Sequence, residues 1–174
     1  MSLRDAIKAQ HDAAEAHPFT ALMLSGAVSP AKYAEHLANH YVIFSAIEER
    51  MRKTGLFDDM PGLFRAERIR ADVLELTREA QPVHGATVRC VDRVMEVDDL
   101  QLLAYVYVYH FADMFGGQMI KSKVPGSGSR FDFDDRSALI SKVRAMLGDD
   151  LADEAQRAFG FTLELFDELA PAAA

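Results

Sequence analysis

The chain has 174 residues, of which 49% are hydrophobic and 26% are charged. This is the composition of an ordinary globular protein, and the length suits one domain, residues 1–174, rather than two. The formal net charge of −8 argues against non-specific binding to nucleic acid or to an anionic membrane surface. The single cysteine, Cys90, excludes an internal disulfide framework and any zinc site built from several cysteines.

The apolar segments are too short and too polar for export or membrane insertion. The first residues lack the apolar run of a signal peptide, and no stretch approaches the roughly 18 uninterrupted apolar residues of a membrane span. The nearest case, residues 102–115, contains Tyr, His and Asp. We therefore expect a soluble, cytoplasmic protein with no membrane partner, and a monomer by default.

Hydrophobic periodicity predicts helices along almost the whole chain. Pro18 ends the first helix, whereas Ser29 and Pro30 form the usual cap and first position of the second. The predicted helices cover residues 3–16, 30–53, 63–79, 86–95, 98–123, 136–146 and 149–169. Residues 124–129 have the composition of a loop, and Phe131–Phe133 alternates but is too short for a sheet. The predicted fold class is all-α.

Two adjacent glycines, Gly116 and Gly117, interrupt the apolar helix predicted over residues 98–123. An interior glycine costs about 1 kcal/mol relative to alanine, so the pair weakens the helix that contains it. Bare backbone at this point indicates close approach by a flat ligand or a crossing helix. Asp113 lies one turn earlier on the same helical face. A carboxylate beside exposed backbone suggests chemistry on a bound ligand.

The first predicted helix bears a candidate metal ligand. Arg4, Ile7, His11 and Ala14 follow one helical stripe, and Glu15 lies one turn after His11. A histidine on an apolar stripe is more often a packed core residue. Here, however, Ala14 leaves space beside the imidazole, and Glu15 can accept the Nδ1 proton and direct Nε2 outward as a ligand. Arg4 can reach an anionic group on the same stripe.

These two helices complement each other, because together they can enclose a planar macrocycle and ligate its iron from one side. Several segments, in the same order along the chain, resemble the haem oxygenase family. The proximal segment of the family, H-x-x-A-E, is similar to His11–Ala16, and its distal G-D-x-S-G-G-Q to Ala112–Gln118. Further similar segments are His40–Glu49, Glu154–Phe159 and Leu165–Leu169.

The resemblance implies a single-domain multi-helix bundle with haem between the first helix and a glycine-kinked distal helix. It implies that His11 is the proximal ligand of the haem iron and that Glu15 is its hydrogen-bonding partner. Asp113 would be the catalytic distal carboxylate, holding a water molecule that delivers a proton. Gly116 and Gly117 would be the positions where the backbone approaches the ring closely.

The resemblance also implies basic and aromatic partners for the haem propionates. Arg4 matches a basic position seven residues before the ligand, and Tyr107 a position where the family often has tyrosine. Lys142 and Arg144 lie where the family places further basic groups, in an uncertain register. Two residues depart from the distal pattern: Ala112, beside the ring, replaces a glycine, and Phe115 replaces a serine.

The family uses haem as both cofactor and substrate, together with O2 and electrons from a ferredoxin or flavoprotein reductase. It opens the ring to biliverdin, CO and ferrous iron. A second hypothesis is a haem-binding or haem-sequestering protein on the same fold, in which Ala112 and Phe115 have altered or abolished oxygenase activity. A third, a non-haem helical enzyme, lacks the carboxylate–histidine set that it requires.

Other motifs favour less specific interpretations. His36 and His40 are an i,i+4 pair such as a metal site uses, but no third ligand has matching spacing, which favours a solvated face. Cys90 is a candidate nucleophile, although a buried structural thiol is the simpler interpretation. The GGQ triplet also marks peptide-release factors, where it lies on an exposed loop rather than in an apolar helix.

Overall fold

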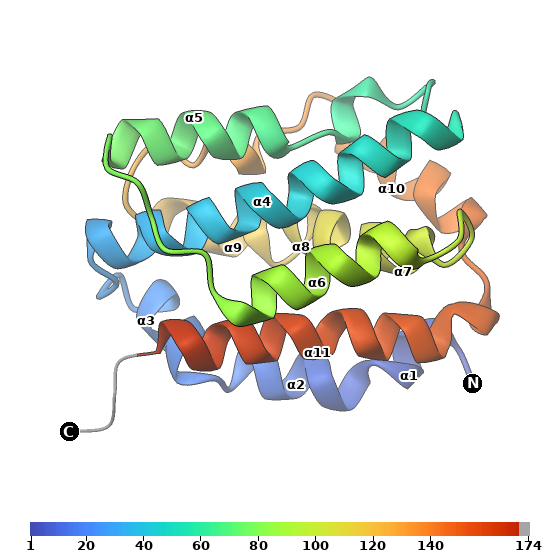
Figure 1. The fold of residues 1–174 in the computed structure, drawn as a ribbon, viewed down its shortest axis with the longest axis horizontal. Coiled ribbons are helices and arrows are strands. Elements are labelled where there is room, and N and C mark those ends of the chain that lie inside the picture. Colours follow the sequence, from blue (N-terminus) through green and yellow to red (C-terminus); the bar gives the residue numbers. More distant parts are fainter. Residues whose placement is uncertain (171–174) are drawn as a thin grey trace.

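The computed structural model describes residues 1–170, and in this part of the chain it contains helices and no strand (Figure 1). The predicted all-α class is therefore confirmed. Short 3₁₀ and π segments link several of the helices. The α-helices are α1 (Leu3–Ala6), α2 (Lys8–Glu15), α3 (Pro18–Leu24), α4 (Pro30–Thr54), α5 (Ala66–Leu76), α6 (Gly85–Glu96), α7 (Leu102–Tyr105), α8 (Phe111–Met114), α9 (Gly117–Ile120), α10 (Arg136–Met146) and α11 (Ala152–Leu169).

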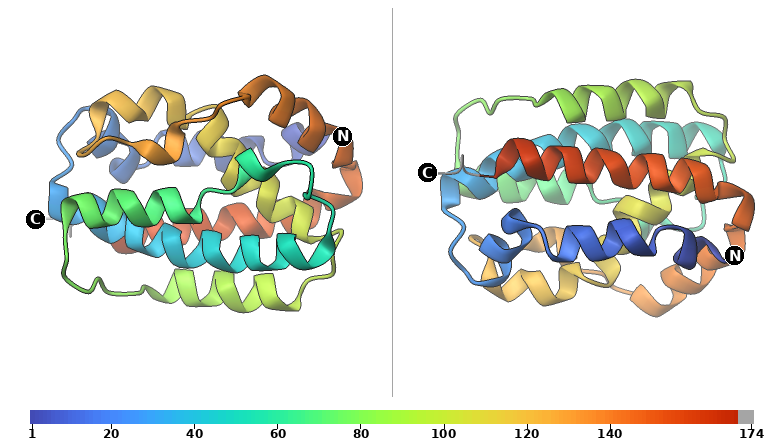
Figure 2. Two further views of the ribbon diagram at one scale, coloured as in Figure 1. Left: turned by 90° about the horizontal axis from the view of Figure 1, so that it is seen from above. Right: turned by 90° about the horizontal axis from the view of Figure 1, so that it is seen from below.

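The long helix α4 lies at the centre and packs against α5 and α6, while α11 packs against α6 and α2. Seen as in Figure 1, α5, α4, α6, α11 and α2 follow one another from top to bottom. The segment α7–α9 and helix α10 cover the remaining side, as Figure 2 shows from above and below. Apolar side chains from all these layers meet in one continuous core, which includes Leu37, Ile47, Leu102 and Leu165.

The start of α4 follows the sequence prediction. Ser29 Oγ accepts a hydrogen bond from the Lys32 amide at 3.1 Å, and Pro30 occupies the first helical position. The helix ends at Gly55, whose φ of 71° a side chain rarely adopts. Local sequence alone therefore sets both ends of this helix.

The prediction of one helix over residues 3–16 is wrong, and the prediction did not include the helix that follows it. Residues 3–16 form two helices, because the backbone at Ile7 (φ −100°, ψ 1°) leaves the helical region between α1 and α2. Pro18 does not only end a helix; it also begins α3. The ring nitrogen Nδ1 of His17 accepts from the Phe19 amide at 3.1 Å and caps this helix.

Helix α5 starts later than the predicted 63–79 because a residue from another helix caps it, and it ends at Leu76. Glu48, which is buried in α4, accepts from the Ala66 amide at 3.1 Å and fixes the start of α5 there. Residues 61–63 form a separate 3₁₀ turn. A cap supplied from a distant segment cannot be read from local sequence.

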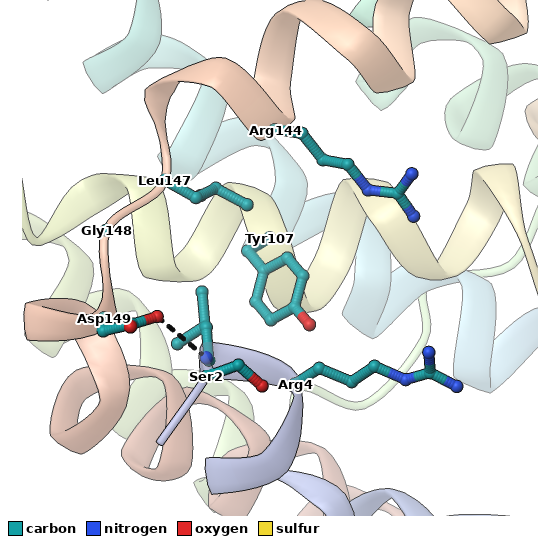
Figure 3. A pocket seen from close by; sticks show the side chains of 8 residues that line it. Ser2, Arg4, Tyr107, Arg144, Leu147, Gly148 and Asp149 are labelled. Atoms are coloured by element: carbon teal, nitrogen blue, oxygen red, sulfur yellow. Dashed lines mark hydrogen bonds between the residues drawn. The ribbon is translucent and has the colours of Figure 1, made fainter.

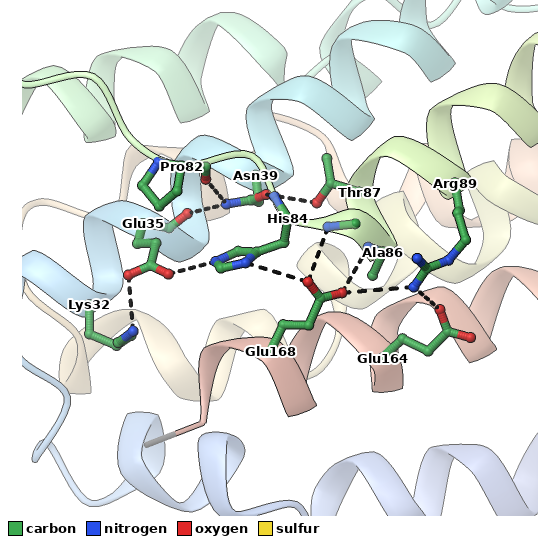
Figure 4. Close-up of polar contacts among 11 residues, drawn as sticks. Lys32, Glu35, Asn39, Pro82, His84, Ala86, Thr87, Arg89, Glu164 and Glu168 are labelled. Atoms are coloured by element: carbon green, nitrogen blue, oxygen red, sulfur yellow. Dashed lines mark hydrogen bonds and ion pairs between the residues drawn. The ribbon is translucent and has the colours of Figure 1, made fainter. Parts of the chain in front are cut away.

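The start of α6 is also fixed from a distance, by a polar network between α4, α6 and α11 (Figure 4). A carboxylate of α11, that of Glu168, accepts from the amides of Gly85 and Ala86 at 3.1 and 2.8 Å. His84 lies between two carboxylates, with Nε2 2.6 Å from Glu35 and Nδ1 3.5 Å from Glu168. The network therefore ties the first turn of α6 to both neighbouring helices.

We expect Glu168→Ala to lower the free energy of unfolding by about 0.5–2 kcal/mol, the usual cost of removing a helix cap. Glu164→Ala is the matched control, since Glu164 lies one turn earlier on α11 and binds only the exposed Arg89. Urea unfolding of both variants measures the effect. Equal stability of the two variants would contradict the capping role.

Candidate functional site

The distal segment around the glycine pair is not one continuous helix, so the prediction for residues 98–123 is corrected. After α7, residues Val106–His110 form a π-helical turn, and α8 follows directly. The helix breaks at Phe115 (φ −113°, ψ −90°), and α9 starts at Gly117. The glycine pair therefore marks the break and the beginning of a new helix, not the interior of an old one.

Two side chains satisfy carbonyl groups next to this break. The side-chain amide nitrogen Nε2 of Gln118 donates to the backbone oxygen of Asp113 at 3.0 Å and to the backbone oxygen of Phe131 at 2.7 Å. The guanidinium of Arg136 donates to the Met114 oxygen at 3.2 Å. A buried carbonyl without a donor costs free energy, so Gln118 stabilises the broken geometry and attaches it to the following loop.

The two glycines have different roles, although both were predicted as close-approach positions. A Cβ added at Gly117 would lie 2.6 Å from two ring atoms of Phe131, so this glycine is required for packing against the protein's own interior. A Cβ at Gly116 would meet only the Ala112 oxygen, at 4.0 Å. Of the pair, only Gly116 is exposed and leaves its backbone open to a ligand.

We expect Gly117→Ala to cost about 1–3 kcal/mol of folding stability, the usual cost of overpacking a filled interior. Gly116→Ala is its matched control. The backbone there is helical (φ −59°), so alanine is allowed and should raise stability by roughly 0.4–1 kcal/mol. Thermal unfolding of both variants distinguishes the positions, and equal destabilisation would contradict the assignment.

An exposed apolar stripe includes Gly116. It consists of Ala112, Phe115, Gly116 and Met119, and we call it the distal stripe. Phe115 is 45% exposed and Met119 is 69% exposed, although both are large apolar side chains. The intervening residues Asp113, Met114 and Gly117 are buried. An exposed apolar surface of this kind commonly marks a ligand site.

The His11 imidazole is accessible on α2, a helix without a buried residue. The side chain is 55% exposed, and its Nδ1 lies 3.7 Å from Glu15 Oε1 and 4.0 Å from Asp12 Oδ1. One ring edge faces Phe159 of α11, with the ring centroids 6.2 Å apart. Nδ1 therefore faces carboxylates, which favours Nε2 as the nitrogen that binds a ligand.

The topology places α2 opposite the distal stripe. At one end, Arg4 of α1 and Tyr107 line the same pocket. At the other end, α3 packs against α9. Since α2 connects α1 and α3, it runs alongside α8, as Figure 2 shows from below. His11 and the distal stripe thus belong to facing elements, and neither is buried by the other.

The pocket at the first of these ends brings two arginines to one tyrosine. In Figure 3 the side chains of Arg4 and Arg144 extend in the same direction on either side of the Tyr107 hydroxyl. Burial raises the pKa of Tyr107, and the nearby charges of Arg144 and Arg4 oppose that rise. Two guanidinium groups and a phenol form a suitable site for carboxylates. The pocket is lined by Ser2, Leu3, Arg4, Tyr107, Arg144, Leu147, Gly148 and Asp149.

Lys142, expected with Arg144 as a further basic partner of the propionates, does not line this pocket. The Lys142 ammonium binds the Asp59 carboxylate at 3.0 Å, in a different hollow. Residues two apart on a helix face different sides. Because α10 turns Arg144 toward Tyr107, it necessarily turns Lys142 away.

Asp113, expected to hold a water molecule, is held by a residue that the sequence analysis missed. Arg130 donates from Nε to Asp113 Oδ2 at 3.0 Å and from Nη2 to Oδ1 at 2.9 Å. Asp113 and Arg130 are both buried, with exposed fractions of 3% and 2% respectively. Burial raises the pKa of Asp113, and the charge of Arg130 opposes that rise. Arg130 lies in a short 3₁₀ helix, Ser129–Phe131, in the connection after α9, where no periodicity relates it to Asp113.

Other buried side chains fix the backbone of Arg130. Asp72 of α5 accepts from the Arg130 amide at 2.9 Å, and Arg65 donates to the Arg130 oxygen at 3.0 Å. Asp72 also accepts from the Ser129 hydroxyl at 2.6 Å. With both its amide and its carbonyl bound, Arg130 presents its guanidinium to Asp113 in one fixed position.

Of the expectations for Cys90 and for the pair His36 and His40, the structure confirms the first and contradicts the second. Cys90 is fully buried within 3.5 Å of the Tyr109 hydroxyl, and burial raises the pKa of its thiol to about 12. This confirms the structural interpretation, because a nucleophile needs a lowered pKa and access. In contrast, His36 is 4% exposed, so the solvated face expected for His36 and His40 is wrong.

Comparison with known proteins decides the family. A model of the heme oxygenase family matches residues 1–142, which include His11, the distal stripe and Arg130. The chain belongs to the heme oxygenase family. The family match thus covers α2, the distal stripe and half of the residues that line the pocket between α1 and the distal segment.

Similar heme oxygenases extend the comparison over nearly the whole chain. Heme oxygenase 1 of Nostoc sp. is 29% identical over 199 aligned residues, covering 96% of this chain and 84% of the relative. Heme oxygenase 1 of Synechocystis sp. is also 29% identical, covering 96% and 82%. The relatives bear the family name, and their alignments include α11, which the family model does not reach.

Solved heme oxygenase structures share the fold. Heme oxygenase-1 from Synechocystis sp. in complex with heme has a TM-score of 0.85 at 25% identity, covering 96% of this chain and 90% of that chain. Heme oxygenase from Leptospira interrogans has a TM-score of 0.83 at 23% identity, covering 97% of this chain and 100% of that chain, which shows a similar fold alone.

Among the helices of residues 1–170, none combines the length and the apolar composition that a membrane span requires.

Proposed function

We propose that this chain is a haem-degrading oxygenase that binds haem between α2 and the distal stripe. The single observation that supports this most is the pairing of an accessible imidazole, His11, with an exposed apolar stripe on the facing segment. A flat apolar ring with an iron centre fits between such surfaces, since Gly116 has no side chain to obstruct it.

Each end of the proposed site has a defined part. His11 Nε2 binds the iron, and Glu15 holds the proton on Nδ1 and keeps the imidazole oriented. Arg4, Arg144 and Tyr107 bind the propionate carboxylates, so of the two basic residues expected on α10 only Arg144 has this part. On the opposite face, Ala112 and Gly116 lie against the ring, and Gly116→Ala should weaken haem binding while leaving folding intact.

Haem supplies both the oxidisable ring and the redox-active iron, with O2 and electrons from a ferredoxin or flavoprotein reductase. The protein supplies position and protons. Arg130 holds the Asp113 carboxylate in place and leaves lone pairs free, since a carboxylate accepts about four hydrogen bonds. Asp113 orders water on the distal side and hands on its protons. We propose that residues 1–174 act as one domain, monomeric and cytoplasmic.

The reaction is tested with purified protein, haemin and ascorbate, or with a ferredoxin and its reductase, in air. We expect the Soret band to disappear as biliverdin absorbance grows. Asp113→Asn, which keeps the shape of the side chain, should bind haem but open the ring about 10²–10⁴-fold more slowly, the range of general acid–base catalysis. A Soret band that persists in the wild type would contradict the oxygenase function.

A haem-binding protein without oxygenase activity is the second candidate, and one observation favours it. The exposed Phe115 adds bulk to the distal stripe. If it fills the space needed for O2, the same assay will show tight haem binding and an unchanged Soret band. Phe115→Ser should then restore ring opening, whereas in an active oxygenase this substitution should change the rate only slightly.

A further inference from the structure

The imidazole of His11 and two carboxylates of the same helix form a set of ligands for a metal ion other than haem iron. His11 Nδ1 lies 4.0 Å from Asp12 Oδ1 and 3.7 Å from Glu15 Oε1. One ligand atom from each of the three side chains lies within 4.8 Å of the other two. Among residues 1–170, no other three His, Cys, Asp or Glu side chains come together in this way. We call His11, Asp12 and Glu15 the α2 ligand set.

The distances within the α2 ligand set are close to those around a bound ion. Imidazole nitrogens and carboxylate oxygens bind Zn²⁺ at roughly 2.0–2.2 Å, so two ligand atoms of a tetrahedral site lie about 3.3–3.6 Å apart. The separations of His11 Nδ1 from the two carboxylates exceed this by less than about 1 Å. All three side chains are exposed, so small rotations close the set without disturbing the core.

The backbone that carries these ligands is held in place, although α2 has no buried residue. Gln10 Nε2 donates to the backbone oxygen of Gln156 at 2.8 Å, and Gln156 Nε2 donates to the backbone oxygen of Ala6 at 2.7 Å. These bonds attach α2 to α11. The three ligands therefore start from a fixed helix, which lowers the entropic cost of assembling them around an ion.

The ligand types indicate a divalent transition-metal ion. Imidazole suits Zn²⁺, Fe²⁺, Ni²⁺ and Cu²⁺, whereas Mg²⁺ and Ca²⁺ prefer oxygen ligands alone. Ferrous iron, which the proposed reaction releases, belongs to this class of ion. The carboxylate of Asp12 is shared, since its Oδ2 lies 2.6 Å from Lys8 Nζ while its Oδ1 faces His11. An ion can therefore bind Oδ1 without displacing Lys8, although the charge of Lys8 opposes it.

We propose that the α2 ligand set binds a divalent transition-metal ion in the haem-free protein, and that this ion excludes haem from His11. A neutral imidazole has one proton, so one ring nitrogen donates while the other has a free lone pair. Nε2 has that lone pair for haem iron when Glu15 holds the proton on Nδ1. An ion on Nδ1 leaves the proton on Nε2 and also occupies Glu15. The exclusion of haem rests on the proposed function, but the ion binding does not.

Ion binding is tested on the haem-free protein, with Zn²⁺ as the probe and calorimetry as the measurement. Binding should be lost in His11→Ala. It should weaken by at least about tenfold in Asp12→Ala, since removing even an outer partner of a metal ligand costs about 10–100-fold. Glu164→Ala is the matched control, because it removes one exposed carboxylate from α11 and should leave the affinity unchanged.

NMR of ¹⁵N-histidine-labelled protein reports which ring nitrogen binds the ion. Zn²⁺ should shift the Nδ1 signal of His11 and leave a proton on Nε2. Lys8→Met should raise the affinity about threefold or more, because it removes a positive charge beside Asp12. Zinc binding that survives in His11→Ala, or coordination through Nε2, would overturn the proposal.

Exclusion of haem is tested by adding haemin to protein with Zn²⁺ present at about ten times its dissociation constant. Competition for one imidazole should raise the apparent dissociation constant of haem about elevenfold, and a chelator should reverse the change. Asp12→Ala is the decisive variant, because it should bind haem normally and lose most of the zinc effect.

These readouts need no turnover, so they separate this inference from the proposed function. If zinc and haem compete but the wild type forms no biliverdin, the proposed function fails and the exclusion stands. If zinc binds Nδ1 and haem affinity stays the same, the exclusion is overturned, whether or not biliverdin forms.

Discussion

His11→Ala should abolish the histidine-ligated spectrum of the haem complex. His11 is the accessible imidazole of α2, the helix proposed to bind haem opposite the distal stripe. Loss of an outer partner such as Glu15 costs about 10–100-fold in affinity, and loss of the ligand itself should cost more. Optical and resonance Raman spectra of the ferric complex measure ligation directly. Free imidazole should restore the spectrum in this variant, because the substitution leaves space beside Ala14.

Asp12→Ala provides the control for this experiment. Asp12 is adjacent to His11 and carries a carboxylate within 4.0 Å of its Nδ1, but it is engaged by Lys8 on the surface. We expect unchanged haem ligation in Asp12→Ala and weaker binding in Glu15→Ala. Normal ligation in His11→Ala would refute the proximal assignment. Equal losses in Asp12→Ala and Glu15→Ala would indicate a carboxylate metal site instead.

Arg130→Met should lower folding stability by about 3–5 kcal/mol at neutral pH, the cost of leaving one partner of a buried ion pair alone. Asp113 is 3% exposed and has no other charged hydrogen-bond partner among the described residues. Without Arg130, its burial raises the pKa further above the ordinary value of about 3.9. Asp113→Leu in the same chain should restore much of the stability, since it removes the unpaired charge.

The loss of folding stability in Arg130→Met should decrease as the pH falls. At neutral pH the unfolded Asp113 is ionised, whereas the folded variant must bury the charge or bind a proton. As the pH falls through the raised pKa of the folded variant, the carboxyl takes up a proton and the stability deficit shrinks, disappearing near the unfolded pKa. Urea unfolding of wild type and Arg130→Met between neutral and acidic pH measures the gap. A gap that widens on acidification would contradict a buried unpaired carboxylate.

Local sequence signals were sufficient where a helix supplies its own ends. Ser29, Pro30 and Gly55 set the limits of α4, and the predicted α10 has the observed bounds, Arg136–Met146. They were insufficient for α5, which starts three residues later than predicted, where Glu48 of another helix binds its first turn. The start of α6 was predicted to within one residue, although Glu168 of α11 also binds it.

The distal segment shows the same division within one motif. The sequence predicted that glycines here serve an approaching group, because the pair has no local benefit. It did not distinguish them, since adjacent residues differ only in what each faces. Phe131, fourteen residues later, packs against Gly117, whereas Gly116 is open. Gln118 likewise gains its role from carbonyls exposed at the break.

The sequence by itself predicted the all-α class. It also indicated that His11 and Glu15 lie on one helix and the glycine pair near Asp113 on another, because helical spacing fixes which residues share a face. Only the tertiary structure decided which face meets which neighbour. It placed Arg144 rather than Lys142 beside Arg4 and Tyr107, brought Arg130 from the connection after α9 to Asp113, and buried His36 and the ring nitrogens of His40. Such contacts join segments far apart in the chain, and no periodicity specifies them.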